Sequence, residues 1–211
     1  MSSTALSIYR PSVFKMQRSF LQIACLLLLC SDGACQQYFP NLTFSQDERS
    51  NAFTVSWYSQ ALKALEEPSL WESRATSEGE TYRFLWLRTF HNPIAVRLTV
   101  NQDGSGVVTV KVTDGAGGYE PGKLIENQSR QLSKDHVQWF LEAIEEQKYW
   151  SLPTSGGGSG LDGAGWILEA VRAHKYKVVD RWSPERGPIR TLGVMMFFDL
   201  GQLHVPLKDI Y

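Results

Sequence analysis

Cysteine is scarce in this chain of 211 residues, and its placement makes the shortage more severe. The three cysteines, Cys25, Cys30 and Cys35, all lie in or beside one apolar N-terminal stretch. If export removes that stretch, the remaining chain has no disulfide, no thiol nucleophile and no cysteine ligand for zinc. A disulfide scaffold is excluded in any case, because small domains of that type are dense in cysteine.

An excess of positive charge is also lacking. Lys and Arg number 21 against 22 Asp and Glu, which gives a formal net charge of -1. A protein that binds nucleic acid needs a basic surface to hold phosphates, so we expect no nucleic-acid partner. The hydrophobic content of 43% is that of a folded domain and excludes wholesale disorder.

The sequence motifs of common catalytic and metal sites are missing. No HExxH motif, no histidine pair at ligand spacing and no GxSxG elbow occurs. Residues 117–123 have the spacing of a phosphate-binding GxxxxGK loop, but Leu124 stands where Ser or Thr would bind magnesium, and no helix is predicted to follow. We therefore expect no metal and no cofactor.

The N-terminus has the pattern of a secretory signal peptide. The uncharged run from Ser19 to Cys30 follows Lys15 and Arg18 and precedes small residues. At 12 residues it is too short to span a bilayer as a helix, which takes about 20. We interpret residues 1–35 as a signal peptide with an N-terminal extension, with Met16 as the true start. The predicted location is exported, either periplasmic or secreted.

Cys35 leaves a second outcome open for the exported chain. Gly33, Ala34 and Cys35 resemble the lipobox of bacterial lipoproteins, although Asp32 departs from the apolar residue of that motif. A lipid attached to Cys35 would anchor the protein to a membrane, and this is the one membrane contact that the sequence predicts.

The chain after residue 35 divides into three parts by its patterns. Residues 36–50 are polar and aperiodic and are predicted to be a tether. Residues 51–80 hold a helix with an apolar stripe that includes Tyr58 and Leu62, which Pro68 follows, and then a polar break. Residues 81–211 are predicted to be the folded domain.

The pattern of the last part predicts an α+β fold. Segments 81–90, 94–100 and 107–113 are rich in β-formers and predict a meander, and 165–172 with 176–182 predict a hairpin. Helices are expected from Ser133 onward and over 189–200, with a glycine-rich loop over 114–130. The result would be one antiparallel sheet of about five strands, with its two or three helices on one face.

The stretch from Tyr82 to Trp182 resembles a loose group of uncharacterised exported bacterial domains. The matching residues are Asp103-Gly104-Ser105-Gly106, Leu132-Ser133, Tyr149-Trp150 and the strand Tyr176–Trp182. The likeness covers about half the chain and is one of architecture. It implies an α+β fold and transfers no active site.

Two functional hypotheses follow. The first is a non-catalytic interaction or structural module with an unidentified protein partner, in which Arg181 and Trp182 contribute to an interaction surface. The second is a carboxylate-dependent hydrolase or cation-binding periplasmic protein that uses Asp162, Glu169 and Asp180. The tetrapeptide Asp-Gly-Ala-Gly occurs at 114–117 and again at 162–165, and we interpret both copies as turns.

Overall fold

The computed structural model describes residues 36–211 apart from positions 157 and 159. Over this part of the chain, six strands form one antiparallel sheet in the order β4-β3-β2-β1-β5-β6. The strands are β1 (Thr81–Arg88), β2 (Ile94–Val100), β3 (Gly106–Thr113), β4 (Leu124–Leu132), β5 (Ala164–Arg172) and β6 (Lys175–Trp182). The predicted α+β class is confirmed, with one strand more than expected.

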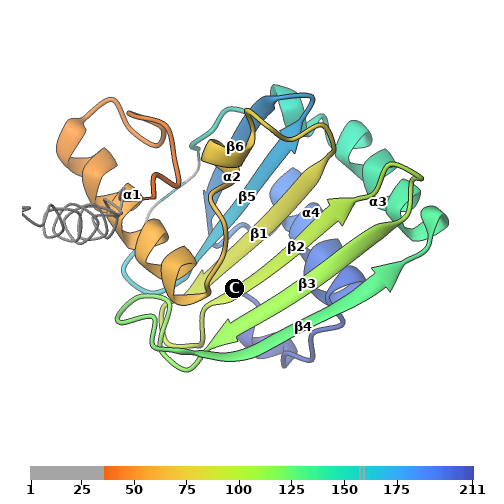
Figure 1. Ribbon diagram of the computed structural model, residues 1–211. Coiled ribbons are helices and arrows are strands. Elements are labelled where there is room, and N and C mark those ends of the chain that lie inside the picture. The colour runs from red at the N-terminus through yellow and green to blue at the C-terminus, as the bar shows by residue number, and fades with distance from the viewer. Residues whose placement is uncertain (1–35, 157, 159) are drawn as a thin grey trace, which may run out of the picture. The chain divides into compact units, whose positions relative to one another are not determined.

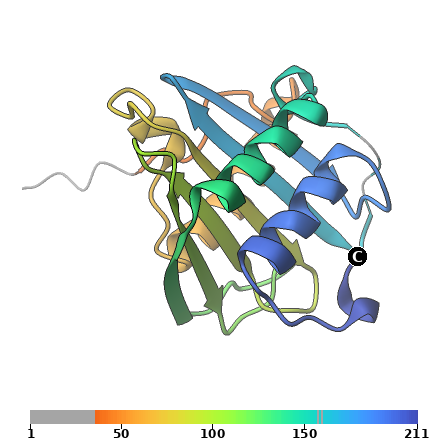
Figure 2. The same cartoon turned by 90° about the vertical axis from the view of Figure 1, so that its right-hand side faces the viewer.

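Helices cover both faces of this sheet (Figures 1 and 2). On one face lie α1 (Glu48–Ala64) and the single turn α2 (Leu70–Ser73). On the other face α3 (Lys134–Glu146) and α4 (Pro188–Val194) lie side by side, and α4 continues as a π-helical turn over Met195–Leu200. The expectation that all helices share one face is therefore wrong.

The central strand β1 shows why the sheet needs two covering layers. Its side chains alternate between the faces, because successive residues of a strand point in opposite directions. Phe84 and Trp86 belong to the core beneath α3 and α4, whereas Leu85 and Leu87 belong to the core beneath α1. All four side chains are fully buried, as the nearly continuous apolar sequence of this segment predicts.

The larger of the two cores is built around aromatic rings. Trp86 stacks on Phe197 with a centroid separation of 4.5 Å, and Trp166 packs edge-on against Trp86 at 5.4 Å. The α3 side of this core is fixed by Ser133, whose hydroxyl accepts a hydrogen bond from the His136 amide and so caps the helix as predicted.

Residues 36–50 do not behave as a tether. Tyr38, Phe39 and Phe44 are buried with Tyr58 and Leu62 of α1 in the core on that face of the sheet. Residues 36–47 form an irregular strap ahead of α1, and their aromatic side chains supply the apolar area that holds the strap against this face of the sheet.

The segment after β3 is the second departure from prediction. The glycine-rich loop was expected over 114–130, but residues 124–132 form edge strand β4, which pairs with β3 from Gly106–Leu132 to Thr113–Leu124. Only Leu132 of this strand is buried. An edge strand with one solvated face can be polar nearly throughout, since its pairing comes from backbone hydrogen bonds.

Candidate functional site

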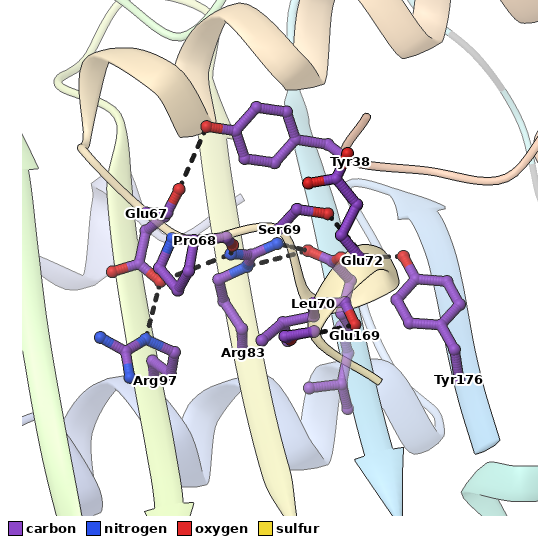
Figure 3. A network of polar contacts seen from close by, with 12 residues as sticks. Tyr38, Glu67, Pro68, Ser69, Leu70, Glu72, Arg83, Arg97, Glu169 and Tyr176 are labelled. Atoms are coloured by element: carbon purple, nitrogen blue, oxygen red, sulfur yellow. Dashed lines mark hydrogen bonds and ion pairs between the residues drawn. The ribbon is translucent and has the colours of Figure 1, made fainter. Parts of the chain in front are cut away.

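The most deeply buried charges lie on the α1 face of the sheet (Figure 3). Arg83 of β1 and Glu169 of β5 are in register and both are fully buried. The Arg83 guanidinium donates to Glu169 Oε2 from Nε at 2.9 Å and from Nη2 at 2.5 Å. The Tyr176 hydroxyl donates to the other carboxylate oxygen at 2.8 Å. Both oxygens of Glu169 are thus occupied.

Glu67 joins the same network from the segment between α1 and α2. It lies 2.9 Å from Arg97 Nε, 3.1 Å from Lys111 Nζ and 3.5 Å from Arg83 Nη1. Burial by itself would raise the pKa of Glu67, but these three cations outweigh it and hold that pKa below its ordinary value. The carboxylate is therefore ionised at neutral pH.

This network attaches the N-terminal strap to the sheet. Arg83 Nη1 also donates to the Pro68 carbonyl at 2.5 Å, and the Tyr38 hydroxyl donates to the Glu67 carbonyl at 3.1 Å. Ser69 Oγ donates to the Gln37 carbonyl at 2.5 Å. The Arg83–Glu169 pair is fully buried, the surrounding contacts are buried or part-buried, and all of them join groups of the protein to one another, so the arrangement serves the fold.

A solvent-accessible cavity lies on the same face, between α1 and the end of the sheet. Its volume is about 790 Å³, which falls within the range of roughly 300–1,000 Å³ that small-molecule sites occupy. Six aromatic side chains contribute to its lining: Phe44, Phe53, Trp57, Tyr58, Tyr119 and Trp182. We refer to this site as the α1 cavity.

The two Asp-Gly-Ala-Gly turns meet at Thr89, which lines the α1 cavity. The Gly118 amide donates to the Thr89 carbonyl at 3.1 Å, and the Thr89 amide and hydroxyl both donate to the Gly163 carbonyl at 2.9 Å. Gly117 lies so close to β1 that an added Cβ would be 2.6 Å from the Arg88 carbonyl oxygen. The first copy lies in a turn segment, as interpreted, whereas the second copy leads directly into β5, which begins at Ala164. The residues that follow the first copy, Gly118 to Glu120, line the cavity.

Asp180 supplies the acid of the α1 cavity. It lies on β6, is half-buried, and lines the cavity together with the buried Tyr58 of α1. Desolvation raises the pKa of Asp180 to about 6, although the Tyr58 hydroxyl and the Arg181 charge oppose the shift. Burial, with Asp180 nearby, also raises the pKa of Tyr58 well above its ordinary value.

The mouth of the α1 cavity carries several exposed apolar side chains. Phe53, Tyr119 and Leu161 are 71%, 65% and 94% exposed. Phe53 lies 6.3 Å from Trp57, and Trp57 lies 6.2 Å from Trp182, measured between ring centroids. A run of aromatic rings therefore leads from solvent along α1 to β6.

The structure separates the three carboxylates of the hydrolase hypothesis. Asp162 is exposed in the loop before β5, Glu169 is in the ion-pair network, and Asp180 lines the α1 cavity. Of the two residues proposed for an interaction surface, Trp182 lines the cavity, whereas the guanidinium of Arg181 donates to the backbone carbonyls of Pro153 and Thr154. Cys35 lies outside the described residues.

Several residues of the cavity were not identified from the sequence. Tyr58 was assigned only to the apolar stripe of a helix, and Phe44 to a tether. The signal that could have identified Phe44 is the density of aromatic residues in Tyr38-Phe39-Pro40-Asn41-Leu42-Thr43-Phe44, which is high for a solvated linker. Arg83 is fully buried, and no local pattern in the sequence indicates that burial.

The fold and the cavity define an α+β domain in which aromatic side chains and a half-buried acid line one site. No protein-family model matches the chain, and no curated protein matches it at a significant level. Among the described residues, no helix is long and apolar enough to cross a membrane. The same residues include no group of three or more His, Cys, Asp or Glu placed to hold a metal ion.

Proposed function

We propose that residues 36–211 form a non-catalytic binding domain whose binding site is the α1 cavity. The carrying observation is the coincidence of a cavity of about 790 Å³ with exposed aromatic and apolar side chains at its mouth. Exposed large apolar groups gathered at one place are typical of interaction sites, whereas single ones are ordinary. A cavity with apolar walls and few polar groups is the common form of a small-molecule site.

The carboxylate-dependent hydrolase is the weaker candidate. A carboxylate pair requires two acids close together at one reacting centre. Glu169 is committed to Arg83 and Tyr176, and Asp162 does not line the α1 cavity. Asp180 is thus the one member of the hypothetical set that a ligand in this cavity would reach.

The binding proposal is tested by screening small organic fragments with and without a blocked cavity. Protein-observed NMR of the wild-type chain identifies the fragments that bind, and Thr54→Trp then places an indole at the cavity lining. Ala52→Trp is the matched control, because Ala52 is exposed on the same helix and does not line the cavity. We expect binding to be lost in the first variant and kept in the second. Fragments that bind equally to both would contradict the proposal.

We also propose that the protein is exported, as a member of the group of exported bacterial domains that it resembles. The support is the apolar run Ser19–Cys30 with its basic flank. Intact mass measured on the protein from cell fractions tests this. A chain that starts near Gln36 indicates a cleaved leader, and one that starts at Cys35 with added acyl mass indicates a lipoprotein. A full-length chain in the cytoplasm would contradict export.

A further inference from the structure

We infer that the α1 cavity takes an organic cation, a methylated ammonium group on an apolar body, with Asp180 as its counter-ion. This inference rests on the proposed function and names the ligand class for the same site. It depends on two features of the cavity: the sign of the charges in its lining and its aromatic walls.

The charged residues that line the cavity are all acidic. Within the described part of the chain they are Asp180 and the exposed Glu120, with no lysine or arginine among the lining residues. The cation next in sequence, Arg181, donates to the carbonyls of Thr154 and Pro153 at 3.1 and 3.0 Å and to the Asp180 backbone carbonyl at 2.6 Å. Its guanidinium does not contribute to the lining, so the charges that line the cavity are both negative.

Three elements present groups to the Asp180 carboxylate. Tyr58 of α1 and Arg181 of β6 both act on it, and Glu120 lines the cavity from the loop between β3 and β4. Asp180 is half-buried, and among the described residues it forms no ion pair, unlike Glu67 and Glu169 of the network. A carboxylate partly withdrawn from water without a paired cation is costly, and a cationic ligand would compensate it.

Aromatic rings form the walls around this acid. The Trp57 ring lies 5.0 Å from Tyr58 and 6.2 Å from Trp182, at interplanar angles of 45° and 53°. The Trp57 indole is held in place, because its Nε1 donates to the Gly117 carbonyl at 2.6 Å. Aromatic faces attract cations through their quadrupole, and cages of this composition recognise quaternary ammonium groups.

The aromatic lining favours a methylated ammonium over a metal ion. A hard metal ion such as calcium takes about six to eight oxygen ligands, carboxylates prominent among them. The cavity lining holds two carboxylates, Asp180 and Glu120, and the described residues include no group of three or more His, Cys, Asp or Glu placed to hold a metal ion. A weakly hydrated cation matches the six aromatic side chains of the lining, and the remaining volume accommodates an apolar body.

Binding of choline and of its uncharged isostere 3,3-dimethylbutan-1-ol tests the inference, because the two differ in charge and hardly in shape. Trp57 and Trp182 line the cavity, so tryptophan fluorescence together with titration calorimetry can follow each ligand. We expect choline to bind the wild-type chain at least about tenfold more tightly than the alcohol, as one desolvated charge pair with aromatic contacts would provide. Acidification from pH 7.5 to 5 should weaken choline binding by about tenfold, because Asp180 then gains a proton.

Asp180→Asn keeps the side-chain shape and removes the charge. We expect this variant to bind choline no better than the alcohol and to lose the pH dependence. Asp162→Asn is the matched control, since Asp162 is an exposed carboxylate outside the cavity lining, and it should retain the wild-type preference. Unfolding curves of both variants verify that they are folded.

The outcomes separate this inference from the proposed function. If the alcohol binds as tightly as choline, or if choline shows no saturable binding, the inference is wrong. The proposed function then stands as long as the fragment screen finds compounds that Thr54→Trp excludes. If choline binds but Asp180→Asn leaves its preference unchanged, Asp180 is not the counter-ion and the inference is equally overturned.

Discussion

Arg83 and Glu169 face each other across β1 and β5, and a single carboxylate oxygen of Glu169 accepts two hydrogen bonds from the Arg83 guanidinium, at 2.9 and 2.5 Å. Neither side chain has any contact with solvent. A buried pair of this kind gives little net stability, because each ion loses its hydration, but removing one partner leaves the other charge uncompensated. The pair is therefore more sensitive to single substitutions than to joint replacement.

The first prediction concerns this asymmetry. Glu169→Ala should lower the free energy of unfolding by about 3–5 kcal/mol, because Arg83 would remain buried without its main partner. The double variant Arg83→Met with Glu169→Leu should be destabilised less than Glu169→Ala alone, because no buried charge is left without its partner. Glu67 would remain ion-paired with Arg97 and Lys111 in that variant. Urea denaturation of the single and double variants measures the effect. If the losses of unfolding free energy caused by the two substitutions simply add in the double variant, the prediction is wrong.

The second prediction concerns the pH dependence of stability. The pKa of Asp180 is about 6 in the folded chain and 3.8 in the unfolded reference, so the unfolded chain releases this proton first. Below pH 4 Asp180 is protonated in both states and does not reduce the stability of the folded chain. As the pH rises to about 6, the unfolded chain gains stability by ionising Asp180 more easily, so the folded chain becomes relatively less stable. Asp180→Asn should remove this loss and raise the free energy of unfolding at pH 7 by up to roughly 3 kcal/mol.

Urea midpoints of the wild type and Asp180→Asn between pH 4 and 8 measure that difference. It should grow between pH 4 and 6 and level off above that range. Asp162→Asn is the control, because its exposed carboxylate has no comparable environment. A difference that is constant with pH would show that Asp180 is not buried as described. A gain in stability on losing the acid would be typical of a residue retained for binding.

The third prediction concerns the start of α3. The Ser133 side chain caps the His136 amide, so Ser133→Ala should cost about 1 kcal/mol of unfolding free energy. Ser133→Asp should restore most of it, since aspartate caps equally well and its charge favours a helix N-terminus. Thermal and urea unfolding of both variants check this. Equal destabilisation by alanine and aspartate would exclude capping as the cause.

The fourth prediction concerns Gly117, whose carbonyl holds the Trp57 indole of the α1 cavity. In Gly117→Ala the new Cβ would be 2.6–2.7 Å from backbone atoms of Leu87 and Arg88, which cannot move as a side chain could. We expect a loss of about 1–3 kcal/mol and a changed tryptophan emission, because the Trp57 indole donates to the Gly117 carbonyl. Gly158→Ala is the matched control, with no atom within 4 Å of its added Cβ. If Gly117→Ala and Gly158→Ala show the same stability and the same tryptophan emission, Gly117 does not lie as close to the β1 backbone as described.

The strands of the domain could be predicted where their sequences carry a local signal. Segments 81–90, 94–100, 107–113, 165–172 and 176–182 were placed within two residues of β1, β2, β3, β5 and β6, because burial on one or both faces selects β-branched, aromatic and apolar residues. Strand β4 escaped prediction because Leu132 is its one buried residue, and its pairing with β3 uses backbone groups that any sequence supplies.

The candidate site was predictable to a smaller extent, for a related reason. Asp180 was selected from the sequence and lines the cavity, but Tyr58, which lines the same cavity, is far away in the chain. Likewise nothing in the local sequence pairs Arg83 with Glu169, which is 86 residues away. Such pairs follow from strand order and register, and a single sequence gives no periodic signal for either.

The burial of Tyr38 limits how freely the domain could move on a lipid attached to Cys35. Only Gln36 and Gln37 separate Cys35 from that side chain, and Gln37 is itself held by its amide hydrogen bond to Glu72. Two extended residues reach about 7 Å, much less than the diameter of a small domain. A chain anchored at Cys35 would thus rest directly against the bilayer surface in a restricted set of orientations, whereas a free chain would tumble in all directions.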